Sequence, residues 1–251
     1  MVLHGLRFAF GTLSVLRVRV DRWDRASAGR AMLAAPLVGV VLGVLAGALG
    51  AVAAWRGAPL LAAVASVAAL AALTRGLHLD GLADVADGLG SGRPAEDALR
   101  IMKQSDIGPF GVLTLVLLMF AQIACLEAQF AHSAARGALA VLAAAVTGRC
   151  ALGWGCLRSV PAARPGGLGA MVAGTVSPAG ATAVSLLSAV ALALLGADPR
   201  YALSLTLGLL AAWLLLRRCV RRFDGITGDV LGAMTETAAV FCLIGLTLSR
   251  R

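Results

Sequence analysis

The chain contains few charged residues. Only 14% of its 251 residues are Asp, Glu, Lys or Arg, whereas 59% are hydrophobic, and the mean hydropathy is +0.88. A water-soluble domain of this length needs a more polar surface than this composition can supply. The composition therefore excludes an ordinary soluble protein and predicts an all-α, polytopic membrane protein.

The chain also lacks the cysteine patterns of zinc sites and disulfide frameworks. Its five cysteines form no CxxC pair and do not cluster with the three histidines. Such clustering is what a structural zinc site or a disulfide-stapled fold requires. We interpret the cysteines as reduced, small apolar side chains.

Neither a removable leader nor a linker can be recognised. Residues 3–16 carry an apolar helical stripe but no small-residue cleavage pattern, so we interpret them as an interfacial helix and not as a signal peptide. No Pro/Gly/Ser-rich linker and no repeat of 20 to 50 residues is present. We therefore predict one integral membrane domain over residues 1–251.

Apolar runs long enough to cross a bilayer recur along the chain. A transmembrane helix needs about 20 predominantly apolar residues. The runs that meet or approach this length are 32–55, 58–77, 110–131, 137–156, 179–195, 201–216 and 237–249. We predict about seven transmembrane helices from these runs.

The distribution of charge predicts the orientation. In a soluble protein a net charge of +9 would suggest nucleic acid as a partner, but here most of the 22 Lys and Arg residues fall on one side if the N-terminus is cytoplasmic. Cytoplasmic loops of membrane proteins carry this excess of positive charge. We expect lipid headgroups and no nucleic acid as partners, and we expect segments 78–109, 157–178 and 217–236 to carry the chemistry on the cytoplasmic side.

Two of these segments have recognisable local patterns. Residues 94–103 begin with Pro94, Glu96 and Asp97 and then alternate apolar and basic sides, which predicts a short amphipathic helix that ends before Gly108. Residues 157–178 are rich in Gly and Pro, and we expect them to form an irregular lid without helix or strand.

Three carboxylates follow the second apolar run. At 100° per residue, Asp80, Asp84 and Asp87 fall within about 60° of one another on a helix. Such a face repels itself unless a cation joins it, and Mg²⁺ takes one or two carboxylates while keeping water and substrate phosphates. The alternative is a solvated, charged end of a transmembrane helix.

A second acidic face is predicted at the start of the last span. Asp229 and Glu236 are seven residues apart and share a helical face, although Asp229 alone could merely complement a helix N-terminus. Two acidic faces that open on the same side resemble two walls of one site. We therefore predict a metal site formed by Asp80, Asp84, Asp87, Asp229 and Glu236.

Several basic residues could neutralise a di- or triphosphate. The candidates for substrate binding are Arg93, Arg100, Lys103, Arg149 and Arg164. Most could instead be topology determinants that meet lipid headgroups. Arg149 is the exception, because it lies at the end of an apolar run and not in a loop, and it could bind a phosphate. His78 points away from Asp80 on an ideal helix, and we interpret it as a packing or interfacial residue and not as a ligand.

Two long strings resemble a known family. HLDGLADVADGLGSGRPAEDALRIMKQSDIGPFGV, followed later by GITGDVLGAMTE, is similar to cobalamin synthase, the adenosylcobinamide-GDP ribazoletransferase family. The resemblance implies a membrane enzyme that joins adenosylcobinamide-GDP to α-ribazole or its 5′-phosphate and releases GMP, with Mg²⁺ required. It also implies corrinoid and nucleoside substrates and a location in the bacterial cytoplasmic membrane with the active site on the cytoplasmic face. It leaves open a homo-oligomer or a complex with other cobamide-assembly enzymes.

For this reaction we expect Asp80, Asp84 and Asp229 to hold the metal and Asp87 to act as general base, although these roles are interchangeable on the sequence alone. Two other functions share parts of this pattern. A CDP-alcohol phosphotransferase would also use aspartates, but its later GxxxDxxxD string is not found. A cation- or proton-coupled transporter would place its acidic residues at the bilayer midplane instead of at one face.

Overall fold

The computed structural model describes residues 2–248, and its helices are joined by short loops and two longer segments. The helices are α1 (Val2–Leu13), α2 (Arg25–Trp55), α3 (Pro59–Leu73), α4 (Leu77–Gly90), α5 (Ala95–Ile101), α6 (Pro109–His132), α7 (Ala134–Gly155), α8 (Gly167–Val172), α9 (Pro178–Gly196), α10 (Arg200–Phe223) and α11 (Gly228–Leu248). Residues 2–248 contain no β-strand, only isolated bridges that join Leu157 to Val176 and Ala162 to Ile226. The predicted all-α class is confirmed.

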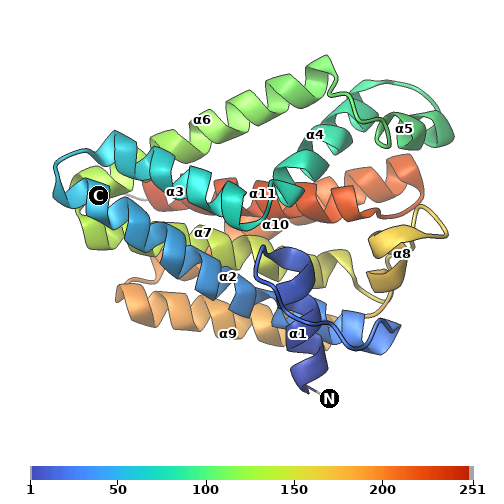
Figure 1. The fold of residues 1–251 in the computed structure, drawn as a ribbon, viewed down its shortest axis with the longest axis horizontal. Helices are drawn as coiled ribbons and strands as arrows, with labels where there is room; N and C mark the ends of the chain where they lie inside the picture. Colours follow the sequence, from blue (N-terminus) through green and yellow to red (C-terminus); the bar gives the residue numbers. More distant parts are fainter. Residues whose placement is uncertain (1, 249–251) are drawn as a thin grey trace.

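The long helices run along a common axis and surround α7 and α11 (Figure 1). Helices α2, α6, α7, α9, α10 and α11 are each long and apolar enough to span a membrane. The most apolar window is 78% buried in α7 and 67% in α11, but only 17% in α9. The molecule is therefore a polytopic bundle with two inner helices and an outer layer whose apolar side chains face outward.

The seventh predicted span is broken. Helices α3 and α4 together pass the same length and hydropathy test, but they are bent by 89° relative to each other. Arg75 and Gly76 at the break both have left-handed backbone angles, with φ of 56° and 68°. The prediction of about seven spans is confirmed. Within the predicted run 58–77, however, the helix α3 ends at Leu73, and the acidic residues Asp80, Asp84 and Asp87 lie in the separate helix α4.

Glycines let α2 approach α7 closely. A Cβ atom at Gly39 would lie 2.6 Å from the Ala145 carbonyl oxygen, and one at Gly47 would lie 2.8 Å from the Ala138 carbonyl oxygen. Small residues at helix contacts are the usual means of close packing in membranes, where hydrophobic burial between helices gains little.

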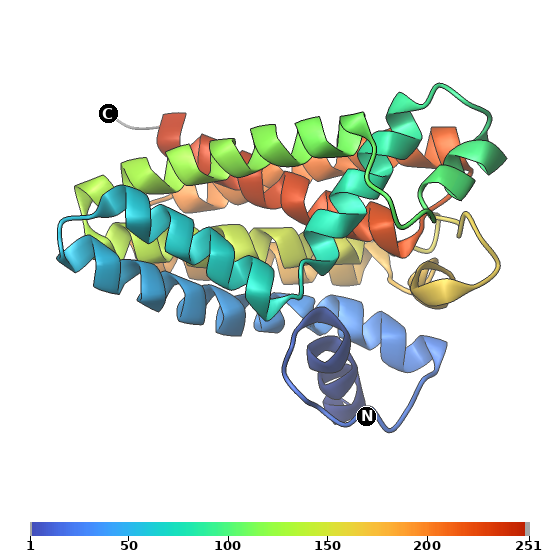
Figure 2. The same cartoon turned by 45° about the horizontal axis from the view of Figure 1, so that its top comes forward.

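The longer connections gather at one end of the bundle (Figure 2). Helices α4, α5 and α8, the end of α10 and the start of α11 all lie there, whereas the opposite end has only tight turns between consecutive helices. The three segments 78–109, 157–178 and 217–236 are thus brought together. Helix α5 confirms the predicted amphipathic helix, with Ala98 and Met102 buried beneath it.

Segment 157–178 is more ordered than predicted. It contains the short helix α8, and the Arg25 guanidinium donates hydrogen bonds to the carbonyls of Ala170 and Ala173 at the end of that helix. The expectation of an irregular lid without helix or strand was wrong, because a distant arginine satisfies carbonyl groups that the local sequence leaves without partners. Arg25 itself begins α2, where Asp24 accepts a hydrogen bond from the Ser27 amide at 2.8 Å, and this bond lowers the pKa of Asp24.

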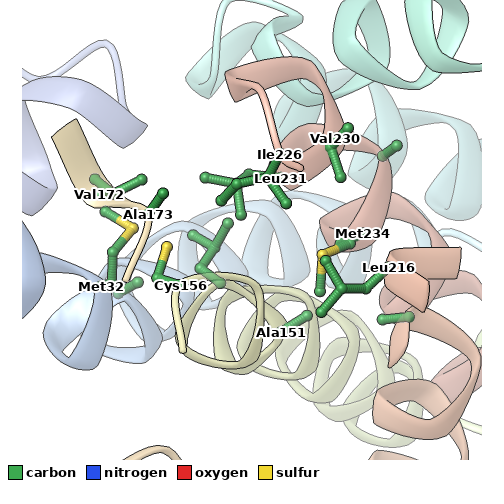
Figure 3. Close-up of a cluster of buried hydrophobic side chains, with 14 of the residues drawn as sticks. Met32, Ala151, Cys156, Val172, Ala173, Leu216, Ile226, Val230, Leu231 and Met234 are labelled. Carbon is green, nitrogen blue, oxygen red and sulfur yellow. The ribbon is translucent and has the colours of Figure 1, made fainter. Parts of the chain in front are cut away.

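An apolar cluster supports this end of the bundle from inside (Figure 3). It combines side chains from α2, α7, α8, α10, α11 and the residues before α11, among them Met32, Cys156, Val172, Ile226 and Met234. Because the cluster joins segment 157–178 and the residues before α11 to the inner helices, it holds these parts of the chain in fixed positions relative to one another.

Candidate functional site

The two predicted acidic segments pack directly on each other. A Cβ atom at Gly81 of α4 would lie 2.8 Å from the carbonyl oxygen of Asp229 in α11. A Cβ atom at Gly232 would lie 3.2 Å from the Cα atom of His78. Only glycine permits this approach at Gly81, so the GLAD string places Asp80 and Asp84 beside the start of α11.

Asp84 lies at the electrostatic centre of this contact. It is half-buried, and the negatively charged groups that act on it are Asp229, Asp80 and Asp87, in decreasing order. Arg164 is the positive group that partly offsets them. Within residues 2–248, no ion pair or hydrogen bond is formed by the side chain of Asp80 or Asp84. The carboxylates of Asp80 and Asp84 are therefore largely uncompensated.

Asp87 is held differently. Its Oδ2 atom accepts a hydrogen bond from the Gly108 amide at 2.7 Å, and its Oδ1 atom accepts one from the Gly111 amide at 2.9 Å. These amides are at the start of α6, where the helix has no capping side chain of its own. The carboxylate thus supplies the N-terminal cap of α6 and complements its dipole. Asp87 is buried, unlike Asp80 and Asp84.

Glu236 is not brought together with the aspartates. It lies two turns further along α11, where it accepts a hydrogen bond from Gln122 at 2.9 Å and lines an interior cavity of about 30 Å³. Arg149 lines the same cavity and is only 3% exposed. An Arg149 Nη atom lies 3.5 Å from His78 Nδ1, while Arg149 Nε and His78 Nε2 are buried without hydrogen-bond partners in the described residues. We call Gln122, Arg149 and Glu236, with His78, the interior polar cluster.

A pocket of about 280 Å³ opens beside the acidic contact. Its polar lining includes Asp80, Asp229, Arg164, His78 and Thr227, together with the backbone of residues 166–170. Asp80 also lines a second, more open hollow of about 600 Å³ with Arg75 and Ala83. The exposed carboxylate of Asp80 therefore stands where the two hollows meet.

Segment 157–178 forms one wall of the 280 Å³ pocket. The Ala163 amide donates to the Ile226 carbonyl and the Ile226 amide donates to the Pro161 carbonyl, both at 2.9 Å. Arg164 also donates a hydrogen bond to the Leu99 carbonyl. These bonds attach the wall to the start of α11 and to α5, so the guanidinium of Arg164 is positioned near Asp84 and Asp229.

The other predicted basic residues lie elsewhere. Arg93 and Arg100 line a shallow pocket with Asp97 and Gln104, and Arg100 forms an ion pair with Asp97 at 3.1 Å. Lys103 is exposed beside them. Of the five residues predicted to bind substrate, only Arg164 lines the pocket of Asp80 and Asp229.

Thr227 and His78 were not among the predicted site residues. The Thr227 hydroxyl donates to Asp229 Oδ2 at 3.1 Å and accepts a hydrogen bond from the Val230 amide at 3.3 Å. A threonine two residues before an aspartate at a helix start is a recognisable capping pattern, so Thr227 could have been found. The pocket position of His78 could not, because it depends on the contact between α4 and α11.

The donor chemistry of the acidic contact fits a hard divalent cation. Among the described residues, no group of three or more His, Cys, Asp or Glu side chains already forms a metal cage. Mg²⁺ does not require such a cage, since it is typically held by one or two carboxylates with water and substrate phosphates. Asp80 and Asp229 supply carboxylate oxygens to the 280 Å³ pocket, which is large enough for those other ligands, and Asp84 interacts with both of them.

The fold and this site define a class of protein: an α-helical, multi-pass membrane protein with a carboxylate-lined pocket at one end of its bundle. Comparison with known proteins narrows the class. The family model described as cobalamin-5-phosphate synthase matches residues 5–247, and the chain belongs to this family.

Curated relatives agree along nearly the whole chain. A Frankia casuarinae protein named adenosylcobinamide-GDP ribazoletransferase is 43% identical, over 97% of this chain and 94% of its own length. Proteins with the same name from a Nocardioides species and from Sinorhizobium medicae are 42% and 39% identical, covering 95% and 88% of this chain and 96% and 86% of their own lengths. No solved structure matches the chain. The resemblance inferred from the two strings is confirmed.

Proposed function

We propose that this protein joins adenosylcobinamide-GDP to α-ribazole or its 5′-phosphate, forming adenosylcobalamin or its 5′-phosphate and releasing GMP. Family membership supports the reaction, and the family description, which names a cobalamin-5-phosphate synthase, favours the phosphorylated acceptor. The observation that supports the assignment to a site is the close contact of α4 with α11, because Asp80 of α4 and Asp229 of α11 line one pocket and Asp84 interacts with both.

In the proposed reaction a ribose hydroxyl of the ribazole attacks the phosphorus atom attached to cobinamide. A new oxygen–phosphorus bond forms, the bond from that phosphorus to the bridging oxygen breaks, and GMP leaves with the bridging oxygen. The hydroxyl proton passes to a carboxylate. The residues that position the pyrophosphate and balance its charge supply most of the catalysis in such transfers.

Asp80 and Asp229 are the proposed ligands of Mg²⁺, with Asp84 beside them. Bound Mg²⁺ would stabilise charge on the phosphate oxygens. Arg164, which lines the same pocket, would bind a non-bridging phosphate oxygen by a charge-assisted hydrogen bond. The guanidinium is held in place by its bond to the Leu99 carbonyl.

We assign proton acceptance to Asp84 instead of Asp87. Both oxygens of Asp87 accept backbone hydrogen bonds from α6, which leaves that carboxylate poorly suited to take a proton. Asp84 is half-buried, next to the pocket residues Asp80 and Asp229, and has no hydrogen-bond donor of its own among residues 2–248. A base must reach the proton that it removes, and Asp84 interacts with Asp80 and Asp229, which line the pocket, whereas both oxygens of Asp87 are bonded to the start of α6.

The proposed orientation places this end of the bundle in the bacterial cytoplasm. The four arginines at the end of α10 lie at the same end as the acidic contact (Figure 1), in agreement with the positive-inside rule. Soluble nucleotide substrates would then reach the pocket directly.

Turnover by the purified protein in detergent tests the proposal. Adenosylcobinamide-GDP and α-ribazole 5′-phosphate are supplied with and without Mg²⁺, and GMP and the joined corrinoid are measured. We expect metal-dependent product, and a loss of about 100-fold or more in kcat for Asp84→Asn. Asp106→Asn is the matched control, because Asp106 is exposed and lies outside the pocket. Unchanged turnover in Asp84→Asn would refute the role of Asp84.

A further inference from the structure

The outer surface of the bundle has a groove that the proposed reaction does not use. It lies between α9 and α10 and has a volume of about 410 Å³, and its lining includes Trp154, Ser185, Leu186, Thr206, Leu210 and Trp213. The lining is almost entirely apolar. Because α9 and α10 are both candidate spans, this groove faces the hydrocarbon of a membrane.

Few polar groups remain unsatisfied within the groove. The Trp154 indole nitrogen donates to the Ser185 hydroxyl at 3.0 Å, and the Thr206 hydroxyl donates to the Ala202 carbonyl at 2.9 Å. Leu186 and Leu210 on the two walls are 61% and 51% exposed. The groove therefore suits a hydrocarbon chain, which requires no hydrogen bonds.

One end of the groove is positively charged. Residues 206, 210, 213 and 217 of α10 recur every three or four positions, so Arg217 continues the same stripe that forms the groove wall. The Arg217 guanidinium lies over the Trp213 ring, 4.8 Å from its centroid. This stacking orders the arginine beside the groove.

No carboxylate neutralises this end in the part of the chain that the structure describes. None of its ion pairs involves Arg217, Arg218 or Arg221, and all three arginines are exposed. An apolar groove that ends at an unneutralised, ordered guanidinium matches the two parts of an anionic lipid. A second copy of the chain fits less well, since a two-fold contact through this groove would bring both arginine clusters to the same level.

We propose that the groove between α9 and α10 is a binding site for one anionic phospholipid, with an acyl chain along Leu186 and Leu210 and the phosphate on Arg217. The site is separate from the acidic pocket, and the proposal does not depend on the reaction catalysed. A zwitterionic lipid would fill the groove with the same acyl contacts but would gain less from the arginine.

Quenching of tryptophan fluorescence by brominated lipids tests the site, because Trp154 and Trp213 both line it. In a Trp23→Phe/Trp55→Phe background, the two remaining tryptophans report on the groove. We expect half-maximal quenching at about fivefold lower mole fraction of brominated phosphatidylglycerol than of brominated phosphatidylcholine, the ratio that one basic side chain contributes at an anionic surface.

Two variants that remove the same charge distinguish binding in the groove from a general attraction of anionic lipids to the basic end of α10. Arg217→Gln should bring the ratio close to one, whereas Arg218→Gln, which removes the same charge one residue away, should leave most of the preference. Equal quenching by the two lipids in the parent protein, or equal effects of the two variants, would overturn the proposal. Absence of quenching together with cross-linking of α9 between two copies would also overturn it, by assigning the groove to a dimer.

The test remains decisive if Arg217→Gln does not fold. Unbrominated phosphatidylglycerol should then displace brominated phosphatidylcholine from the parent protein more effectively than unbrominated phosphatidylcholine does. Equal displacement would refute a headgroup preference.

Discussion

Helix α11 carries two acidic residues whose surroundings are opposite. Asp229, at the helix start, lines a pocket that is open enough for substrate, whereas Glu236 lies in a cavity with room for about one water molecule. Seven residues of helix separate them by about 10 Å along the axis. A shared helical face is therefore not a shared site, because depth in the bundle decides which carboxylate can meet a metal or a phosphate.

In the interior polar cluster, charged side chains stabilise helix packing instead of binding a ligand. Arg149 is buried and Glu236 is half-buried among apolar side chains, and each stabilises the other because an isolated charge there is costly. Gln122 from α6 and His78 from α4 contact this pair from two further helices. The cluster thus joins four helices beneath the acidic pocket and holds α4 in place, whereas the aspartates of the pocket remain available for ligands.

The largest expected effect is a difference in activity between variants of Asp229 and of Glu236. Asp229→Asn should lower kcat by about 100-fold or more and raise the Mg²⁺ concentration needed for half activity, because a proposed ligand is lost. Glu236→Gln should leave that Mg²⁺ requirement unchanged in the enzyme that remains folded. A similar shift in Mg²⁺ requirement for both variants would return Glu236 to the metal site.

The interior polar cluster should respond in stability. Glu236→Gln leaves the Arg149 guanidinium, which cannot lose its proton, without a counter-charge, and should cost about 3 kcal/mol of folding free energy. Arg149→Met should cost less, because a carboxyl group can take up a proton. Thermal unfolding in detergent measures both, and the double variant should recover part of the loss. Purely additive losses would show that the pair is not coupled.

Two of the predicted basic residues, Arg164 in the pocket and Arg100 outside it, should also differ in their effect on substrate binding. Arg164→Gln should raise KM for adenosylcobinamide-GDP by about 10-fold, the loss of one charge-assisted hydrogen bond in a pocket. Arg100→Gln removes an exposed pair with Asp97 and should change KM less than threefold. Steady-state kinetics at constant ionic strength test this prediction. An equal rise in KM for the two variants would show that the substrate contacts both the pocket of Arg164 and that of Arg100.

The smallest expected effect is at Asp87. An asparagine keeps one capping oxygen for α6, so Asp87→Asn should cost about 1 kcal/mol of stability. Its kcat should fall far less than that of Asp84→Asn. A loss in Asp87→Asn as large as in Asp84→Asn, with unchanged thermal unfolding, would make Asp87 the general base after all.

Much of the architecture could be predicted from hydrophobic pattern. Apolar runs of about 20 residues gave the spans, because a bilayer imposes that length on any helix that crosses it. The amphipathic pattern of residues 95–101 gave α5 for a similar local reason. The order seen in segment 157–178 was missed, since the hydrogen bonds of Arg25 that complete α8 come from a residue about 145 positions away.

The sequence by itself determined the membrane class, the family and the set of acidic residues, because hydropathy, motif spacing and helical period are local properties. Only the tertiary structure decided which of those residues meet. The close approach of Gly81 to Asp229 brings the two predicted acidic faces together. The amides at the start of α6 donate hydrogen bonds to both oxygens of Asp87. Glu236 lies deeper in the bundle, along α11, and lines a separate interior cavity. Each of these outcomes depends on which helices pack together, and helix period alone does not specify that.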